Sequence, residues 1–399
     1  MHLAFVTSLI TDGKPTTGFE IANEAIVVGL RATGCKITQI GFRLPRQKTV
    51  GDAQTIVLQT LDVENSSAST VQKIKWVAGA MVNGMPVGGS KLRAVSWQQL
   101  ESALNSLGKI DGIVINSVQM PTAFPQLLKY APYIYVAHNV EHQSSKQNAK
   151  SASGALDRLL YQRDARLLEP IEKRLCNNAR HVFFLSEDDR DYFNPGDDRG
   201  TVLQLAFPLQ SNSATQNPDI SGISNDVGLI GTWSWQPNFV GLTWFLDEVV
   251  PLLNNDMTIS IAGSLPHALT AKHPGVSFVG RVENAEEFVK NSGVLALISR
   301  SGTGVQLKTI EAFQMGMPCC ATLSSVRGIS GLPDNCIVED DAKNFAKALN
   351  SMVKNRRNGK LVRLDGEAFA ASQRDALNAG LRVGLNNLDR ENYLNVDRS

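Results

Sequence analysis

Short apolar runs and longer amphipathic stretches alternate along the chain. In the first half the apolar runs predict β-strands at His2–Ser8, Lys36–Phe42, Thr55–Thr60, Asp111–Asn116, Tyr133–Ala137 and His181–Ser186. Between them, apolar positions at helical spacing predict helices that include Gly18–Ala32, Trp97–Leu107 and Leu156–Asn177. Strands that alternate with helices in this way indicate α/β layers around a parallel sheet.

The pattern is interrupted at residues 208–225, PLQSNSATQNPDISGISN, which have the composition of a linker. A second series follows, with predicted strands at Asp226–Thr232, Thr258–Ala262, Val276–Val279, Val294–Ser299 and Pro318–Thr322, and helices at Asn238–Leu253, Ala285–Asn291, Gln306–Met315 and Ala342–Lys354. We therefore expect two Rossmann-like α/β domains, residues 1–207 and 226–374, facing each other across a ligand cleft at the carboxyl ends of their sheets. The tail at about 375–399 is helical in composition and is a candidate to pack on the first domain.

Composition narrows the class of protein. Hydrophobic residues at 43% and charged residues at 19% of 399 exclude a disordered chain, and a formal charge of +1 argues against a nucleic-acid partner. No apolar run is long enough to span a bilayer, and the start MHLAFVTSLITDG has no features of a secretion signal. Five cysteines without a C-x-x-C pair favour buried thiols over disulfides or zinc. We expect a cytoplasmic protein, with the inner face of the cell membrane as a candidate location.

Charge is unevenly spread, because residues 1–150 hold 14 basic and 9 acidic residues, a net of +5. Within them, the segment Lys73–Trp97 is expected to be a glycine-rich loop that combines lysines and Arg93 with Trp76, Met81 and Met85. This mixture fits peripheral contact with an anionic membrane or a lipid-linked phosphate. An ordinary surface loop whose lysines extend into solvent fits equally well.

The stretch Ser299–Thr322, SRSGTGVQLKTIEAFQMGMPCCAT, carries the clearest chemistry. A strand runs into a glycine-rich loop that opens a helix, and free N–H groups at a helix start bind phosphate. Lys308 adds a positive charge suited to a diphosphate, and Glu311 could accept hydrogen bonds from ribose hydroxyls. The alternative is a β–α turn followed by a solvated Lys–Glu pair.

A second polar run, His138-Asn139-Val140-Glu141-His142, follows the strand Tyr133–Ala137 directly. A histidine at the carboxyl end of a parallel strand projects into the expected cleft, where it could donate a hydrogen bond to a sugar hydroxyl or a leaving diphosphate. A helix cap and a metal site at the two histidines are the alternatives, and Glu141 in particular could cap the next helix.

These stretches resemble GT-B-fold retaining glycosyltransferases of family four, and most closely those of bacterial polysaccharide biosynthesis with G-T-x-x-L-K-x-x-E-A loops. The second Glu of the family's E-x7-E pattern corresponds to Glu311, followed by Ala312, Gly316 and Pro318, whereas Thr303 stands at the position of the first. The resemblance implies that Lys308 contacts the donor diphosphate, that Glu311 binds the ribose and that Thr303 and Gly304 flank the phosphates and sugar. It also implies that His138 lies in the active site.

Three further loops gain a role from the same resemblance. The loop after Gly231 supplies an Arg and a Lys to the diphosphate in many relatives, but here it holds Trp233, Trp235, Gln236 and Asn238, so Lys308 is expected to carry more of the phosphate charge. Thr17 and Gly18 correspond to the turn that borders the acceptor and the phosphates, and any β–α turn could look like this one. Arg281 and Val282 match the place where the main chain contacts the base.

The sequence thus predicts a metal-independent transferase that needs no cofactor and moves a sugar, with retention, from a nucleotide sugar to a carbohydrate or lipid-linked acceptor. Bacterial surface polysaccharide assembly is the expected setting. The catalytic candidates are His138, Lys308 and Glu141, and the donor-binding candidates are Glu311, Thr303, Gly304, Gly231, Arg281 and Val282. A GT-B-fold sugar-nucleotide epimerase and a non-catalytic two-domain binding protein remain alternatives.

Overall fold

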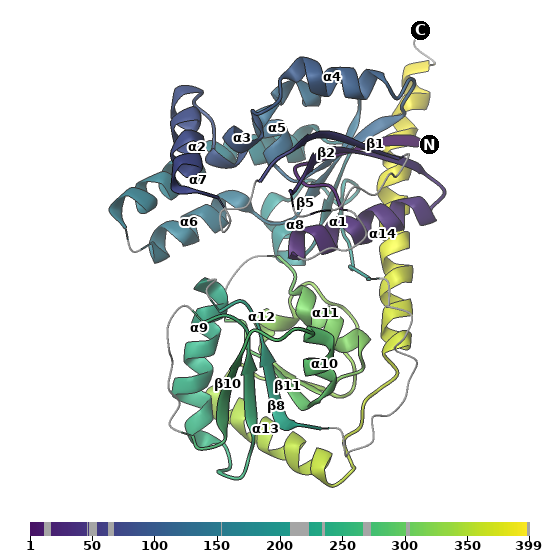
Figure 1. Ribbon diagram of the computed structural model, residues 1–399. Helices are drawn as coiled ribbons and strands as arrows, with labels where there is room; N and C mark the ends of the chain where they lie inside the picture. The colour runs from purple at the N-terminus through teal and green to yellow at the C-terminus, as the bar shows by residue number, and fades with distance from the viewer. Residues whose placement is uncertain are drawn as a thin grey trace. The chain divides into compact units, whose positions relative to one another are not determined.

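The computed structural model divides the chain into two compact units, Met1–Leu205 with Arg374–Ser399 and Ala206–Gln373 (Figure 1). It describes all residues except 12–16, 46, 48–53, 63–67, 153, 208–222, 234–235, 266–272, 301–303 and 397–399, and the side chains of 236–237 and 390–396. Most of the expected linker and Thr303 therefore lie outside the described residues. The expected fold class is confirmed, since each unit is a parallel sheet with helices around it.

The first unit is built on a seven-stranded parallel sheet in the order β3-β2-β1-β4-β5-β6-β7. Its strands are β1 (His2–Thr7), β2 (Lys36–Arg43), β3 (Thr55–Thr60), β4 (Gly112–Asn116), β5 (Tyr133–Ala137), β6 (His181–Phe184) and β7 (Gly200–Val202). Its helices are α1 (Gly18–Ala32), α2 (Thr70–Val82), α3 (Val87–Leu92), α4 (Trp97–Asn105), α5 (Gln119–Ala123), η1 (Pro125–Lys129), α6 (Glu141–Ser151), α7 (Ala155–Asn178) and α8 (Glu187–Phe193). The strands β4 and β5 are buried along their whole length, as expected where helices cover both faces of a parallel sheet.

The second unit has a six-stranded parallel sheet in the order β10-β9-β8-β11-β12-β13. Its strands are β8 (Asn225–Ile230), β9 (Ile259–Ala262), β10 (Val276–Gly280), β11 (Ser292–Leu297), β12 (Cys319–Ala321) and β13 (Cys336–Val338). Its helices are α9 (Gln236–Trp244), η3 (Phe245–Val249), η4 (Val250–Leu252), α10 (Ala285–Lys290), α11 (Leu307–Gln314), α12 (Leu323–Val326) and α13 (Ala342–Arg357).

The last helix, α14 (Gly366–Val396), begins in the second unit and continues into the first. Its buried leucines include Leu377 and Leu381, and a Cβ on Gly29 of α1 would lie only 2.6 Å from the Leu381 side chain. The Asn387 amide donates to His181 Nδ1 at 2.9 Å and to the Asp198 carbonyl at 2.6 Å. The tail is thus an integral part of the first unit.

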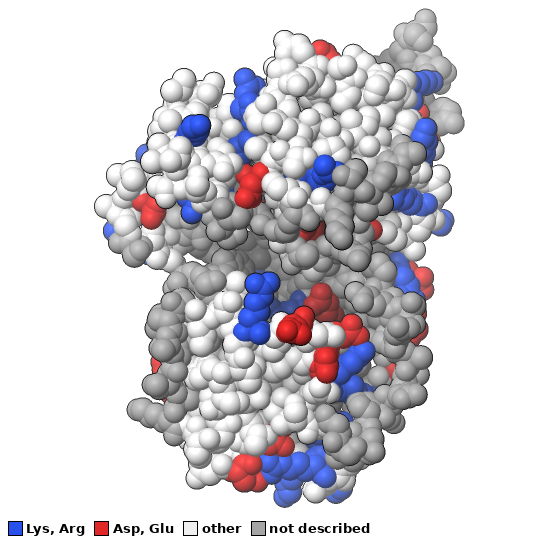
Figure 2. Space-filling model, viewed as in Figure 1, with Lys and Arg blue, Asp and Glu red and all other residues white. Residues whose placement is uncertain are grey.

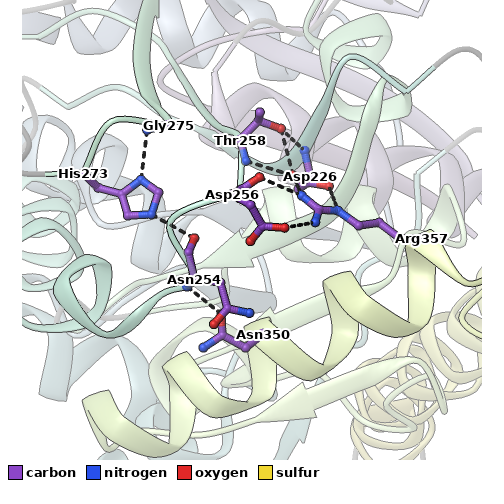
Figure 3. A network of polar contacts seen from close by, with 8 residues as sticks. All are labelled: Asp226, Asn254, Asp256, Thr258, His273, Gly275, Asn350 and Arg357. Atoms are coloured by element: carbon purple, nitrogen blue, oxygen red, sulfur yellow. Dashed lines mark hydrogen bonds and ion pairs between the residues drawn. The ribbon is translucent and has the colours of Figure 1, made fainter.

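Polar contacts hold the amino ends of the second sheet (Figure 3). The guanidinium of Arg357, at the end of α13, binds both carboxylate oxygens of Asp226, at 2.9 and 2.6 Å, and also contacts Asp256. His273 accepts from the Gly275 N–H at 3.0 Å, which leaves its other nitrogen to donate to the Asn254 carbonyl. Because ligands of such sheets bind at the carboxyl ends of the strands, we assign this network a structural role.

The expected loop over Lys73–Trp97 is wrong, because these residues form most of α2, then α3, and the start of α4. Two of the glycines that indicated a loop instead permit close packing of helices. A Cβ on Gly79 would lie 2.7 Å from Ser90 Oγ, and one on Gly89 would lie 2.5 Å from the Thr122 methyl group.

The expected helix Asn238–Leu253 is also interrupted. The α-helical part ends at Trp244, and a π-helical turn and a 3₁₀ turn follow. Pro251 lies in the last turn and has no N–H to continue α-helical bonding. The three-residue strands β7 and β13 were not predicted.

Candidate functional site

The carboxyl ends of β8, β9 and β10 meet through backbone contacts of glycines. Gly231 N–H donates to the Ala262 carbonyl at 3.2 Å, and Gly263 N–H donates to the Gly280 carbonyl at 2.7 Å. Gly263 has a φ of +120°, and a Cβ there would lie 1.8 Å from the Gly231 carbonyl oxygen. Only glycine fits this position, so the three strand ends form one closely packed edge.

Lys308 of α11 reaches this edge. Its Nζ lies 5.7 Å from the centre of the Trp233 ring and 3.3 Å from where a Gly231 Cβ would stand. Trp233 is 2% exposed and its indole N–H donates to the Ala262 carbonyl at 2.8 Å, so this ring is a structural support. The alternative of a fully solvated Lys–Glu pair is therefore wrong, because the Lys308 side chain is half-buried against the indole.

The burial of Lys308 has an electrostatic consequence. Loss of solvent lowers the pKa of its ammonium to about 8, although the carboxylate of Glu311 acts in the opposite direction. Burial likewise raises the pKa of Glu311, which the charge of Lys308 counteracts and that of Glu286 reinforces. An ammonium and a carboxylate with reduced hydration thus lie three residues apart on one helix, where an anionic, hydroxyl-bearing ligand would replace the lost water.

The glycine-rich loop next to this pair is described only in part. Gly304 is buried with a φ of +74°, and its carbonyl accepts from Arg327 Nε at 3.1 Å. Arg327 Nη2 is buried and has no hydrogen-bond partner among the described residues. Arg327 was not predicted as a site residue. The sequence feature that could have indicated it is a positively charged residue directly after β12 and α12.

Arg281 and Val282, the expected base-contacting residues, follow Gly280 directly at the end of β10. Arg281 is exposed and Val282 is half-buried. Because the Gly280 carbonyl is bonded to Gly263, both residues lie at the same sheet edge as Gly231.

In the first unit, a polar network joins the carboxyl ends of β1, β4 and β5. His138, which follows β5, is 7% exposed, and its Nε2 lies 2.8 Å from Asn116 Oδ1. The Asn116 amide nitrogen donates to Asn23 Oδ1 at 2.7 Å and to Thr7 Oγ1 at 3.1 Å. Asn116 was predicted only as the end of a strand. The sequence feature that could have indicated its place in the site is an amide side chain at the end of a buried apolar run.

This network fixes the state of the His138 ring. Since the Asn116 oxygen can only accept, Nε2 carries the proton and Nδ1 offers a lone pair. Burial lowers the pKa of His138 to about 4, so the ring is neutral near pH 7. The ring also packs on Phe19, with centroids 4.8 Å apart. The expectation that His138 donates a hydrogen bond to a ligand is therefore wrong for this ring state, because its one N–H is bound by Asn116. Nδ1 can instead accept a hydrogen bond from a ligand hydroxyl.

Glu141 begins α6, but it is not the cap of that helix. Instead, Glu172 of α7 accepts from the N–H groups of Glu141 and His142 at 2.7 and 2.9 Å. Glu172 also contacts His142 Nδ1 at 2.7 Å, while Nε2 of this buried histidine contacts the Tyr192 hydroxyl at 2.8 Å. Burial and the charge of Glu172 raise the pKa of Glu141 to about 7. Glu172 is therefore the carboxylate that binds the first N–H groups of α6, and this role was not predicted from the sequence.

Thr17 is the N-cap of α1. Its hydroxyl lies 3.3 Å from the Glu20 N–H, and Glu20 Oε2 accepts from the Thr17 N–H at 2.9 Å. Gly18 is the exposed first residue of the helix. Gln47 binds the other oxygen of Glu20 at 2.9 Å, which ties the start of α1 to the segment after β2.

The structure therefore places Lys308 next to Gly231 in the second unit, with Glu311 one turn further along α11 and Gly304 in the segment before that helix. His138, Glu141, Thr17 and Gly18 lie in the first unit. No group of three or more potential metal-ligating side chains occurs among the residues the structure describes, and no helix in that part of the chain is long and apolar enough to cross a membrane.

Part of the second unit is similar in sequence to a known family. Residues 224–355, which include the Lys308 edge, match the family model described as glycosyl transferases group 1. No curated protein matches the chain significantly in sequence.

Solved structures match along nearly the whole chain. Sucrose-phosphate synthase from Thermosynechococcus elongatus is 14% identical, with 99% of both chains covered and a TM-score of 0.60. Anabaena HepE in complex with UDP is also 14% identical, covering 97% of this chain and all of the other, with a TM-score of 0.58. WaaG, a glycosyltransferase involved in lipopolysaccharide biosynthesis, is 14% identical over 94% of this chain and 95% of its own, with a TM-score of 0.55. The chain thus has the GT-B fold, and residues 224–355 of its second unit are similar to glycosyl transferases group 1.

Proposed function

We propose that the protein transfers a sugar from a nucleoside-diphosphate sugar to a carbohydrate or lipid-linked acceptor, with retention at the anomeric carbon and without a metal or cofactor. The observation that carries this proposal is the Lys308 ammonium held against Trp233 above Gly231, with Glu311 on the same helix. The edge lies within the segment that matches the group 1 family. HepE, whose fold is similar, is described in complex with UDP.

In this proposal the residues of the second unit bind the donor. Lys308 neutralises the diphosphate and stabilises the charge that develops when it leaves. Arg327 fixes the Gly304 carbonyl and so the course of the loop beside the phosphates, while Thr303 flanks the sugar. Glu311 accepts hydrogen bonds from the ribose hydroxyls, and the main chain at Arg281 and Val282 contacts the base.

The residues of the first unit act on the sugar and the acceptor. Nδ1 of His138 accepts a hydrogen bond from a sugar hydroxyl, because Nε2–H is held by Asn116. Thr17 and Gly18 border the phosphates, and Glu141, with a pKa near 7, exchanges protons near the acceptor. Retention through front-face substitution follows the resemblance to retaining enzymes. In this proposal the protein acts in surface polysaccharide assembly at the inner face of the membrane, which it contacts through residues 73–97.

A donor panel tests it directly. The full chain would be incubated with UDP- and GDP-sugars, with and without simple acceptors, and released UDP or GDP would be measured. Nucleotide release that Lys308→Ala abolishes supports transfer. Conversion of the donor to another nucleotide sugar without release would indicate an epimerase, and thermal stabilisation by free sugars but not by nucleotides would indicate a binding protein.

A further inference from the structure

Three polar side chains lie at the carboxyl ends of β1 and β4 and have no part in the proposed transfer so far. Ser8 follows β1, while Ser117 and Gln119 follow β4. The hydroxyls of Ser8 and Ser117 both donate to Gln119 Oε1, that of Ser8 at 3.2 Å. The two serines are buried and Gln119 is half-buried. The fold thus holds the Gln119 amide by its oxygen.

These contacts determine which way the Gln119 amide points. Its oxygen has two lone pairs, and each accepts one serine hydroxyl. The stem of the side chain is backed by α3, because a Cβ on Gly88 would lie 3.7 Å from Gln119 Cγ. Nε2 makes no hydrogen bond to any residue that the structure describes. Gln119 therefore directs its two N–H donors away from the serines, where a ligand can accept from them.

Ser117 adopts a backbone conformation that is unfavourable for serine. Its φ is +74°, in the left-handed region, where a side chain with a Cβ crowds the main chain. Its N–H donates to the Val136 carbonyl of β5 at 3.0 Å, which holds the residue in place. Glycine would adopt this conformation without strain, but it has no hydroxyl for Gln119. Strain that persists for the sake of one polar group is typical of a functional site.

The chemistry of this edge fits an uncharged ligand. Ser8, Ser117 and Gln119 are neutral, and so is His138 near pH 7. On the visible face of the first unit, Figure 2 shows charged side chains scattered among uncharged ones, whereas on the second unit they gather in groups. A phosphate is normally bound by a lysine or arginine, whereas a sugar hydroxyl needs one donor and one acceptor. Gln119 Nε2 offers the donor, and His138 Nδ1, after the neighbouring strand β5, offers the acceptor.

We propose that Gln119 binds a neutral hydroxyl of the acceptor sugar through Nε2, with Ser8 and Ser117 as the positioning residues that hold its amide. This inference rests on the proposed sugar transfer and narrows the acceptor. The group bound at this edge is a neutral carbohydrate and not a phosphate. Gln119 is then a specificity-determining residue that sequence patterns did not indicate.

The test separates acceptor binding from donor turnover. The full chain is given the nucleotide sugar that it hydrolyses, alone and with the methyl α-glycosides of glucose, galactose and mannose or with α-glucose 1-phosphate. Released nucleotide and transfer product are measured. Native protein should transfer to at least one methyl glycoside and poorly to the phosphate.

Gln119→Glu keeps an oxygen for both serines but replaces the outward donor by a second oxygen. The KM for the acceptor should rise about tenfold, while the KM for the donor changes by less than about twofold. The matched control Gln98→Glu, at an exposed position on α4, should behave like the native protein.

Two variants of Ser117 test its positioning role. Ser117→Ala and Ser117→Gly both remove the hydroxyl, but only glycine relieves the left-handed backbone. Both should raise the KM for the acceptor by roughly threefold to tenfold, whereas Ser117→Gly should unfold at a higher urea concentration than Ser117→Ala. A purely structural role would instead make the acceptor KM follow stability.

Several outcomes would overturn the inference. A native acceptor KM in Gln119→Glu excludes the Nε2 contact, and transfer to α-glucose 1-phosphate alone excludes a neutral ligand. Donor hydrolysis that no methyl glycoside diverts would overturn the inference and leave the proposed donor site intact. A native protein that releases no nucleotide from any donor would overturn the proposed sugar transfer itself, and this inference with it.

Discussion

The pKa of Lys308 predicts how nucleotide affinity changes with pH. Burial against Trp233 lowers this pKa to about 8 in the free protein, so about nine-tenths of the side chains are charged at pH 7 and about one-tenth at pH 9. A nucleoside diphosphate binds the charged form, and its own last proton is lost near pH 6, so the ligand charge is constant over this range. Affinity is therefore present below pH 8 and lost as the pH rises through 8. We expect the Kd for UDP or GDP, whichever binds, to rise about tenfold from pH 7 to pH 9.

Isothermal titration calorimetry at both pH values checks this expectation. Lys308→Met keeps the apolar stem over Trp233 but removes the charge, so it should lose roughly 1.5–3 kcal/mol of binding at pH 7, about 10–150-fold in Kd. Its affinity should no longer change between pH 7 and 9. Lys347→Met, at an exposed position on α13, is the control and should keep both the native affinity and the native slope. A native Kd that is equal at both pH values, or an equal slope in Lys308→Met, would refute the reasoning.

Three further predictions concern the supporting residues. Arg327→Lys cannot reproduce the Nε–H bond to the Gly304 carbonyl, so nucleotide Kd should rise about fivefold to tenfold, and an unchanged Kd in calorimetry would contradict its role. Asn116→Ala frees the His138 ring, and turnover should fall more than nucleotide affinity. It also removes the buried hydrogen bonds that the Asn116 amide donates to Asn23 and Thr7, so stability should fall by about 1–3 kcal/mol in urea. Glu141→Gln removes a charge that burial and Glu172 disfavour, and the penalty of that charge grows between the ordinary pKa of 4.5 and the raised pKa of about 7. The substitution should therefore stabilise the protein most above pH 7, less at pH 6 and not at pH 4. Native turnover in Glu141→Gln would exclude a catalytic carboxylate.

The alternation of apolar and polar residues predicts strands and helices correctly where burial of their apolar side chains determines which of the two forms. Strands β3 and β5 and helix α1 begin and end where the sequence predicts. The strands β7 and β13 have three residues each, too few for a period, and exist because a neighbouring strand pairs with them. In Lys73–Trp97, Gly79 and Gly89 did not mark loops as the sequence suggested, because they pack between helices. Gly84, with a φ of +61°, does lie between α2 and α3.

In the candidate site, too, the features set by one continuous stretch of sequence could be predicted, whereas those set by contacts between distant residues could not. Lys308 and Glu311 could be located from one continuous stretch, because the strand, loop and helix that position them are consecutive. The burial of Lys308 could not be predicted in this way, because Trp233, the residue that covers it, follows a different strand. Arg327 and Asn116 act through contacts with residues more than twenty positions away, which leave no local pattern.

The helix α14 has a consequence for the order in which the chain folds. Residues from both ends of the sequence make up the first unit, and Leu377, Leu381 and Asn387 complete packing and hydrogen bonds that begin at Gly29 and His181. During synthesis the second unit has all of its strands before α14 emerges from the ribosome. The first unit, although translated first, therefore finishes folding last, and a nascent chain stalled before residue 374 would expose an incomplete first unit to proteases and chaperones.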